Sequence, residues 1–248
     1  MNKRIIILLL SICLFSFLRA ERVDMKQAGA VTDGTQLNTE LINSTIERLH
    51  ANGGGTLFFP AGIYLTASIC MKSHITLELE AGAVLKFSDN FDEYLPYVEM
   101  RYEGVMMKSF QPLIYAVDAE NITIKGEGTL DGQGKAWWME FFRVIIDLKE
   151  YGKRDINKYQ PMFEQANDMK ALYVETNEDW HNTLDRRFMR PPFIQPIRCK
   201  DVRIEGVKII NSPFWTVNPQ FCDNVTVKGV TIHNVPSTNT GTVKNPYS

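Results

Sequence analysis

Two short segments of the chain gather side chains that could bind a ligand. Residues 128–138 read Gly-Thr-Leu-Asp-Gly-Gln-Gly-Lys-Ala-Trp-Trp, and the second tryptophan of the closing pair is Trp138. Residues 211–219 read Asn-Ser-Pro-Phe-Trp-Thr-Val-Asn-Pro and contain Trp215 and Asn218. An indole offers a flat face on which a sugar ring can stack, and an amide can donate and accept hydrogen bonds. Plain packing explains these side chains equally well, so both interpretations stay open.

Three other patterns favour structural roles over chemistry. The glycines around Asp131 are typical of a strand followed by a tight bend, where two backbones approach closely. Glu78 and Glu80 lie two residues apart on an expected strand, and a solvated outer face explains them better than a catalytic pair. Residues 126–128, Gly-Glu-Gly, lack the third glycine and the following helix of a dinucleotide-binding loop.

The elements that position these segments are indicated by a phrase that recurs along the chain. It occurs at residues 121–126, 201–206 and 224–229, with a weaker copy at 74–79. Each copy alternates apolar or β-branched residues with polar ones, which is typical of a short strand with one buried face. The Asn that opens two copies also begins a glycosylation sequon, but an Asn at the corner of a coil explains it better.

The spacing of the copies indicates the architecture. Ile204 and Val227 are 23 residues apart, and Leu77 and Ile124 are 47 apart, close to two such units. The 80 residues from Ile124 to Ile204 equal one unit plus an insertion of 57. A period near 23 that holds two or three short strands fits one coil of a right-handed parallel β-helix. We therefore predict an all-β, single-stranded parallel β-helix.

Two segments should depart from the coils. Residues 37–50 carry apolar side chains at helical spacing, and the glycines that follow would end a helix there. Such a helix could cap the first coil, whose backbone edges would otherwise be exposed. An insertion at about 135–191 is rich in aromatic residues, Trp180 among them, and long loops on a rigid stack commonly build a binding cleft.

The first twenty residues have the organisation of an export signal. A basic head precedes an apolar run at residues 5–17, and Ala20 could mark the cleavage site. This run is too short to span a bilayer. We therefore expect a secreted or periplasmic protein with no stable membrane insertion, divided into a signal peptide, residues 1–20, and one incomplete β-helix domain, residues 21–248.

Composition excludes several classes of protein. The 248 residues are 44% hydrophobic and 23% charged with a net charge of −2, which is globular and lacks the basic excess of a nucleic-acid binder. The four histidines and the cysteines at 70, 199 and 222 have no metal-ligand spacing, so no metal or other cofactor is expected. We interpret these cysteines as small apolar core residues, with a single disulfide as the lesser alternative. We expect a monomer.

Taken together, four stretches resemble glycoside hydrolase family 28, the polygalacturonases. They are residues 53–64, 79–83, 126–138 and 212–219. The Gly-Gly-Gly-Thr and Pro-Ala-Gly parts of the first stretch are shared with many pectin-lyase-like β-helices. The Asp-Gly-Gln-Gly and Ser-Pro-Phe-Trp phrases are more specific. The resemblance covers about residues 23–240.

The resemblance implies hydrolysis, with inversion, of the α-1,4 bonds between galacturonic acids, so the partner would be pectin or an oligogalacturonide. One Asp would act as general acid and others would activate a water, which requires carboxyl groups about 6.5–9.5 Å apart. In the family these acids come from an Asn-Thr-Asp segment and an Asp-Asp pair, followed by Gly-His-Gly and Arg-Ile-Lys. We take four residues as candidate substrate-binding positions: Trp138, Trp215, Asn218 and Asn239.

The sequence departs from the family at the acidic motifs. After Asn239 and Thr240 the chain reads Gly241 where the family has Asp, and it contains no Asp-Asp, Gly-His-Gly or Arg-Ile-Lys. Asn218 also stands where relatives often carry His. We therefore name no catalytic residue, predict no turnover, and expect a frameshifted or truncated ending near residue 240, with a genuine ending in a chain that has lost catalysis as the alternative.

Two other functions stay open. A non-catalytic carbohydrate-binding β-helix would use the aromatic side chains without chemistry. A calcium-dependent pectate lyase is less favoured, because the sequence shows no cluster of Asp at strand ends.

Overall fold

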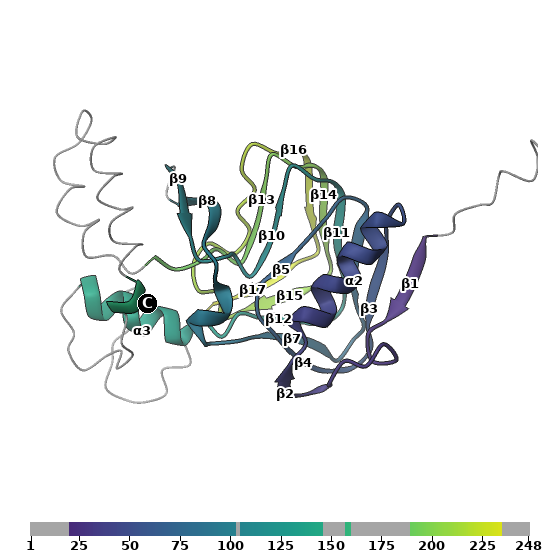
Figure 1. The fold of residues 1–248 in the computed structure, drawn as a ribbon, viewed down its shortest axis with the longest axis horizontal. Coiled ribbons are helices and arrows are strands. Elements are labelled where there is room, and N and C mark those ends of the chain that lie inside the picture. Colours follow the sequence, from purple (N-terminus) through teal and green to yellow (C-terminus); the bar gives the residue numbers. More distant parts are fainter. Residues whose placement is uncertain (1–19, 103–104, 146–156, 160–188, 235–248) are drawn as a thin grey trace, which may run out of the picture.

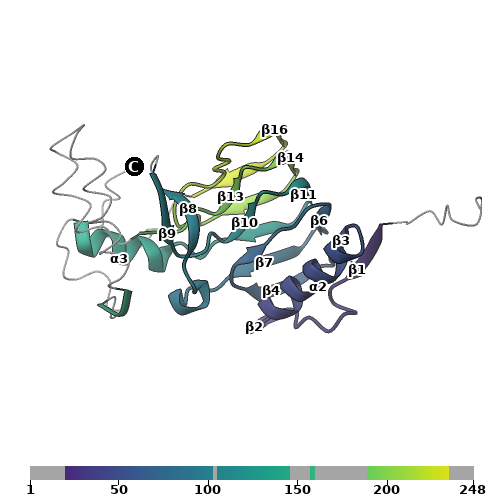
Figure 2. The same cartoon turned by 45° about the horizontal axis from the view of Figure 1, so that its top comes forward.

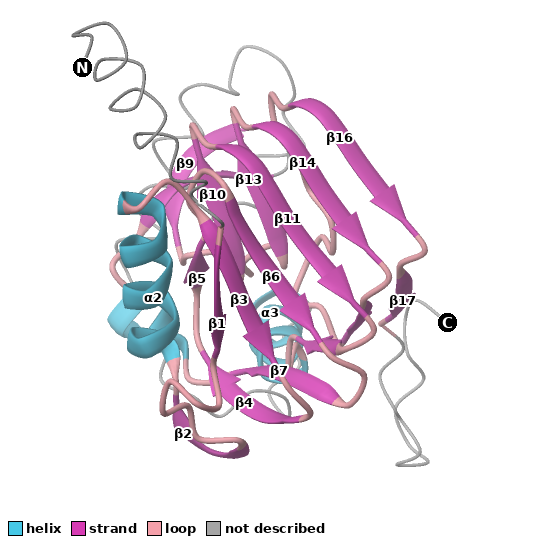
Figure 3. Cartoon of the chain, turned by 90° about the vertical axis from the view of Figure 1, so that its right-hand side faces the viewer, coloured by secondary structure: helices cyan, strands magenta, loops and turns pink. Residues whose placement is uncertain are grey.

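The protein is a stack of coils, and three parallel β-sheets form the sides of the stack (Figures 1 and 3). The computed structural model describes residues 20–102, 105–145, 157–159 and 189–234. We name the sheets A, B and C. The predicted parallel β-helix is confirmed, because every strand pair within these three sheets is parallel.

Each complete coil passes through sheet C, then sheet A, then sheet B. Sheet A holds β1 (Glu21–Asp24), β3 (Gly55–Phe59), β6 (Ile75–Leu79), β11 (Glu120–Gly126), β14 (Lys200–Glu205) and β16 (Asp223–Lys228). Sheet B holds β2 (Asp33–Leu37), β4 (Gly62–Thr66), β7 (Ala83–Phe87), β12 (Thr129–Asp131), β15 (Lys208–Ile210) and β17 (Thr231–His233). Sheet C holds β5 (Ile69–Cys70), β10 (Ile114–Val117) and β13 (Ile194–Ile197).

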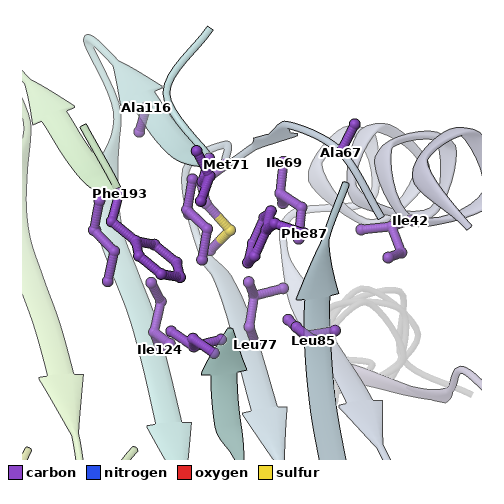
Figure 4. Close-up of a cluster of buried hydrophobic side chains, with 14 of the residues drawn as sticks. Ile42, Ala67, Ile69, Met71, Leu77, Leu85, Phe87, Ala116, Ile124 and Phe193 are labelled. Atoms are coloured by element: carbon purple, nitrogen blue, oxygen red, sulfur yellow. The ribbon is translucent and has the colours of Figure 1, made fainter. Parts of the chain in front are cut away.

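Apolar side chains in register fill the interior of the stack. One line across sheet A joins residues that pair from strand to strand: Leu57, Leu77, Ile124, Ile204 and Val227. The first four are fully buried, and Figure 4 shows Leu77 and Ile124 beside Phe87 and Phe193 in this core. Burying such a side chain contributes about 1.5–3 kcal/mol, which is why the repeated phrase alternates apolar with polar residues.

One spacing in the sequence was interpreted wrongly. Leu77 and Ile124 were expected to lie two coils apart, but β6 and β11 pair directly, so they are neighbouring rungs. The extra length lies between β7 and β10, in a short 3-10 helix (Phe91–Tyr94) and an antiparallel hairpin of β8 (Val98–Tyr102) and β9 (Val105–Ser109). A spacing in the sequence gives only the number of residues between two strands. An insertion about as long as one coil therefore cannot be told from an additional coil.

The corners between sheets explain the recurring Asn and Gly. His74, Asn121, Asp201 and Asn224 all adopt left-handed backbone, with φ of 53° to 65°, and they occupy equivalent places at the start of successive strands of sheet A. The predicted corner role of Asn is thereby confirmed, since Asn tolerates this conformation better than most residues. At the next corner a Cβ on Gly126 would lie 2.0 Å from the carbonyl oxygen of Leu79, so only glycine fits there.

The N-terminal helix forms as expected and lies at the N-terminal end of the stack (Figure 2). Helix α2 (Thr39–Ala51) follows β2 and precedes β3, so it takes the place of a sheet C strand in the first coil. It buries Ile42, Ile46 and Leu49 and packs against β3, β5 and β6. The helix therefore covers apolar side chains of the first coils.

A second helix joins an aromatic cluster outside the coils. Helix α3 (Lys135–Ile145) lies between β12 and β13, and a short 3-10 helix (Asn157–Tyr159) follows it. Trp137 of α3 is fully buried, with its ring 4.1 Å from that of Phe91, 5.1 Å from Phe110 and 5.3 Å from Tyr94. Neither described helix is long and apolar enough to cross a membrane.

The outward face of sheet A carries charges, as expected for Glu78. Its carboxylate lies 2.9 Å from the guanidinium of Arg22 on β1 and 3.3 Å from the ammonium of Lys125 on β11. The hydrogen bond from Arg22 lowers the pKa of Glu78. Glu80 accepts a hydrogen bond from the backbone N–H of Ala61. Both acids therefore have structural partners, in agreement with the solvated face inferred from the sequence.

Candidate functional site

The segment after β15 adds one more rung to sheet C. The N–H of Asn218 donates to the carbonyl of Ile194 at 2.9 Å, and the N–H of Gln220 donates to that of Pro196 at 2.9 Å. Val217 is paired with Ile194 and packs against the core, so Asn218 points to the outer face beside Gln195. The second candidate segment is therefore part of the stack and presents Asn218 on the outside of sheet C.

The side-chain amide of Gln195 holds the hairpin β8–β9 against this outer face through hydrogen bonds. The side chain of Gln195 is fully buried; its Oε1 accepts from the N–H of Arg101 at 3.2 Å and its Nε2 donates to the carbonyl of Arg101 at 2.8 Å. The amide thus satisfies both backbone groups of one hairpin residue, as a neighbouring strand would. The guanidinium of Arg101 lies over the ring of Phe221, 4.6 Å from its centroid.

A stack of three rings continues from the hairpin to the surface. The rings of Tyr102 and Phe214 are stacked at 4.7 Å and 8°, and those of Phe214 and Trp215 at 5.0 Å and 11°. Tyr102 is buried, whereas Trp215 is 43% exposed. The guanidinium of Arg190 lies 5.0 Å from the centroid of Phe214, the middle ring of the stack. Trp215 is therefore an exposed aromatic face held rigidly from behind, which is the arrangement that sugar stacking needs.

The side-chain amide of Asn218 is buried at the outer face of sheet C. The side chain is 5% exposed, and its Oδ1 accepts a hydrogen bond from Nε2 of Gln220. Its buried Nδ2 has no hydrogen-bond partner within the part of the chain that the structure describes. A buried donor without a partner costs about 1–3 kcal/mol, so a ligand acceptor at this position would recover that energy.

The first candidate segment has a structural role at the same corner. Nε1 of Trp138 donates to the carbonyls of Ser212 and Pro213 at 3.0 and 3.2 Å, which ties α3 to the loop that carries Trp215. Its neighbour Trp137 belongs to the core. Asn239 and Trp180 lie outside the described residues.

The acidic residue of the segment 128–138, Asp131, already accepts several hydrogen bonds within the protein. Asp131 accepts from the backbone N–H and the side-chain amide of Gln133 and from Nδ2 of Asn211, at 3.2, 2.6 and 2.8 Å. A Cβ on Gly132 or Gly134 would lie 2.6 Å from the carbonyl oxygen of Asn211. The close backbone approach predicted from these glycines is thereby confirmed, and it is made by the next coil.

Acids at the edge of sheet C are paired with one arginine. Arg198 binds Asp118 through two hydrogen bonds, of 2.7 and 2.9 Å, and lies 3.3 Å from Glu99 on the hairpin. The hydrogen bond from Arg198 lowers the pKa of Asp118. The outward line Tyr115, Gln195 and Asn218 carries a phenol and two amides. Within the described residues we therefore assign no acid pair, and no metal-binding cluster is present there.

An open polar hollow of about 490 Å³ lies at the corner between sheets C and A. Its ionisable lining consists of His50, His74, Asp118, Glu120, Arg198 and Lys200. Asp118 is paired with Arg198, and Glu120 lies 3.5 Å from Nε2 of His74. Because its two acids are balanced by Arg198 and Lys200, the hollow lacks a net charge that would favour one class of ligand.

Nothing in the sequence marks Gln195 and Arg101 as members of the site. The two residues lie 94 positions apart, and no spacing indicates that the side chain of one binds the backbone of the other. The alternating residues 98–109 with a glycine near the middle could have indicated a hairpin. Its docking on sheet C could not have been found, because that contact depends on the tertiary arrangement.

Comparisons with known proteins agree with this architecture. The chain is 28% identical over 223 residues to a probable polygalacturonase of Vitis vinifera, a match that covers 86% of this chain and 37% of that protein. It is 35% identical over 177 residues to an exo-poly-alpha-D-galacturonosidase of Dickeya chrysanthemi, which covers 66% of this chain and 28% of that protein. No protein-family model matches the sequence.

Two solved structures share the fold. A hyperthermoactive exopolygalacturonase from Thermotoga maritima has a TM-score of 0.69 and 32% identity, with 88% of this chain and 48% of that chain covered. A family 28 exopolygalacturonase of Yersinia enterocolitica has a TM-score of 0.60 and 26% identity, with 87% and 39% covered.

The coils and these neighbours define a right-handed parallel β-helix protein of the pectin-lyase type. The chain is related to the polygalacturonases of glycoside hydrolase family 28, which confirms the resemblance inferred from the sequence. It spans 37% and 28% of the length of the two curated relatives.

Proposed function

We propose that this chain is of the pectin-hydrolysing glycosidase type and that it binds polyuronides over the outer face of sheet C. The observation that carries the proposal is the pair formed by Trp215, an exposed ring stacked on the partly buried ring of Phe214, and Asn218 three residues away, whose buried Nδ2 has no partner among the described residues. The ring would accept a sugar face and the amide would donate to a sugar or carboxylate oxygen. The named relatives supply the substrate class.

We propose that Trp138 contributes by positioning. Its indole N–H holds the loop that presents Trp215, so it acts on the substrate through that loop. Asn239 remains a proposed substrate contact that rests on the family resemblance.

We further propose that the chain as written binds without turnover. The sequence contains none of the family's acidic motifs. A general acid or base typically supplies about 10²–10⁴ in rate, so their joint absence removes most of the catalysis.

The proposal is tested by binding and hydrolysis on the same protein. Titration calorimetry with trigalacturonate should show binding that Trp215→Ala and Asn218→Ala each weaken about tenfold, or roughly 1.4 kcal/mol. Phe58→Ala is the matched control, because it removes an aromatic ring from β3 of sheet A, a ring covered by the Arg22 guanidinium. Undiminished binding by both site variants would contradict the site. Rapid release of reducing sugar from polygalacturonate would contradict the absence of turnover.

A non-catalytic carbohydrate-binding β-helix is the second candidate. It is favoured by one observation: in the described part of sheet C the outward line carries amides, and the acids beside it are occupied by Arg198. Binding with no cleavage after prolonged incubation would support this candidate. Slow cleavage that Trp215→Ala abolishes would contradict this candidate and the absence of turnover, and would support a hydrolase that acts through the same binding face.

We also propose that residues 1–20 direct export to the periplasm or medium, and that residues 21–248 belong to one incomplete β-helix domain, with an insertion at about 135–191, and are monomeric. Mass spectrometry of the exported protein should find a new N-terminus near Glu21. Light scattering should give the mass of one chain. An intact N-terminus in the exported fraction, or a dimer mass, would contradict these two points.

A further inference from the structure

Two of the three cysteines in the described part of the chain lie on neighbouring rungs of the stack. The backbone pairs Ile197 with Gln220 and Lys200 with Asp223, so the offset between the two coils is 23 residues on both sides of Cys199. With the same offset, Cys199 faces Cys222. The N–H of Asp223 donates to the carbonyl of Cys199 at 2.9 Å, which fixes this register at the cysteines themselves.

The two cysteines also share one backbone conformation. Each follows a residue in the left-handed region: Arg198 has a φ of 51° and Phe221 a φ of 54°. Asp118, with a φ of 52°, precedes Ala119 in the coil before them. Ala119, Cys199 and Cys222 therefore form one column of small side chains with the same direction.

The two thiol groups have equivalent orientations. Each donates to the carbonyl two residues before it, Sγ of Cys199 to that of Ile197 and Sγ of Cys222 to that of Gln220, both at 3.3 Å, so the side chains extend in the same direction from neighbouring rungs. Neighbouring parallel strands are about 4.8 Å apart. A disulfide needs a Cα–Cα distance of about 4.4–6.8 Å, so the two backbones already stand at bonding distance.

We propose that Cys199 and Cys222 form a disulfide that staples these two coils when the protein meets a low-molecular-weight disulfide such as oxidised glutathione. The half-buried Cys222 thiolate attacks the glutathione disulfide and releases one glutathione thiolate. Cys199 then loses its proton to solvent and attacks Sγ of Cys222, which releases the second glutathione. Two protein thiols are oxidised and one glutathione disulfide is reduced to two thiols.

The order of attack follows from burial. Cys199 is 2% exposed, and burial raises its pKa, whereas Cys222 is more accessible. Formation of the bond should therefore accelerate at alkaline pH, where Cys199 loses its proton. Cys70 lies on β5 opposite Tyr115, on another part of the stack, so it should stay reduced.

Peptide mapping of the folded full chain tests the proposal. After incubation with oxidised glutathione and alkylation of free thiols, trypsin should release the dipeptide Cys199-Lys200 linked to residues 209–228. Cys70→Ser should leave this linked peptide unchanged. The closed loop should raise the melting temperature by roughly 5–10 °C, and reduction should reverse that shift.

Variants separate the bond from other effects of oxidation. Cys199→Ala copies Ala119 of the same column, and Cys222→Ala removes the more exposed partner; each should abolish the linked peptide and the thermal shift. Should Cys199→Ala fold poorly, Cys222→Ala and the mapping of the unaltered chain still decide. Recovery of alkylated Cys199 and Cys222 from the oxidised folded protein, or a linked peptide containing Cys70, would overturn the proposal.

Discussion

The side-chain amide of Gln195 replaces a strand for Arg101: it accepts from the N–H and donates to the carbonyl of that one residue. These two hydrogen bonds join the outer face of sheet C to a hairpin inserted 94 residues earlier. The position of the hairpin near Trp215 and Asn218 therefore depends on a side chain of the coil, Gln195, as well as on the hairpin's own strand pairing.

Replacing Gln195 by leucine should loosen this hairpin. The substitution keeps a similar volume but leaves two backbone groups unpaired, at a cost of about 1–3 kcal/mol. Urea denaturation measures the loss, and amide exchange at Arg101 should rise with it. Gln111→Leu is the control, because its amide makes one exposed hydrogen bond to Pro96 and its loss should cost far less. Equal effects of the two changes would argue against the clamp.

Replacing Gly126 by alanine should destabilise the stack severely. Its φ is 120°, and an added Cβ would lie 2.0 Å from the backbone oxygen of Leu79, which cannot move without breaking the corner. We expect a loss above about 3 kcal/mol in free energy of unfolding. Gly53→Ala is the matched control: its φ is 90°, nothing lies within 4 Å of the added carbon, and strain alone should cost about 1 kcal/mol. Similar losses for both would contradict the steric argument.

The ion pairs of Glu78 should make stability depend on acidity. The pKa of Glu78 is lowered by Arg22, so its contribution is complete above the ordinary carboxyl range and is lost as the pH falls through the lowered pKa. Glu78→Gln should cost about 0.5 kcal/mol at neutral pH, and this cost should disappear as the pH falls through the lowered pKa. Denaturation curves over a series of acidic pH values and in high salt measure this difference. A cost that persists in acid would indicate packing instead of charge.

Trp137 and Trp215 should respond differently to truncation. Trp137→Ala empties the centre of an aromatic cluster and should destabilise the protein by about 3–5 kcal/mol. Trp215→Ala removes an exposed ring and should change the melting temperature little while it weakens binding. Thermal melts of the two variants, measured together, make the comparison. A large thermal loss from Trp215→Ala would indicate a packing role for that ring.

Much of the stack could be predicted because its repeat is local in sequence. The phrases before Gly206 and Gly229 pair at an offset of one coil, and the alternation within each phrase states which face is buried. The helix ending at Ala51 was predictable for the same reason, since apolar spacing and the following glycines belong to one short segment.

The site was less predictable because it depends on contacts between insertions. The sequence left open whether Trp137 and Trp138 pack in the core or stack on a sugar, and Trp138 was the candidate; in the structure Trp137 lies in the core and Trp138 donates to the backbone carbonyl of Ser212. The stacking of Trp215 on Phe214, and of Phe214 on Tyr102, joins a hairpin to a loop 112 positions later. Only the coiled arrangement brings these rings together.

Both long excursions leave the stack at the same corner, between the end of a sheet B strand and the start of a sheet C strand. The hairpin follows β7 and helix α3 follows β12, and the register of every flanking strand pair is preserved. Residues could therefore be added or exchanged there at the modest entropic cost of a longer loop. This makes the corner a natural grafting point, where the length and chemistry of the segments bordering the outer face of sheet C can be redesigned while the coils keep their order.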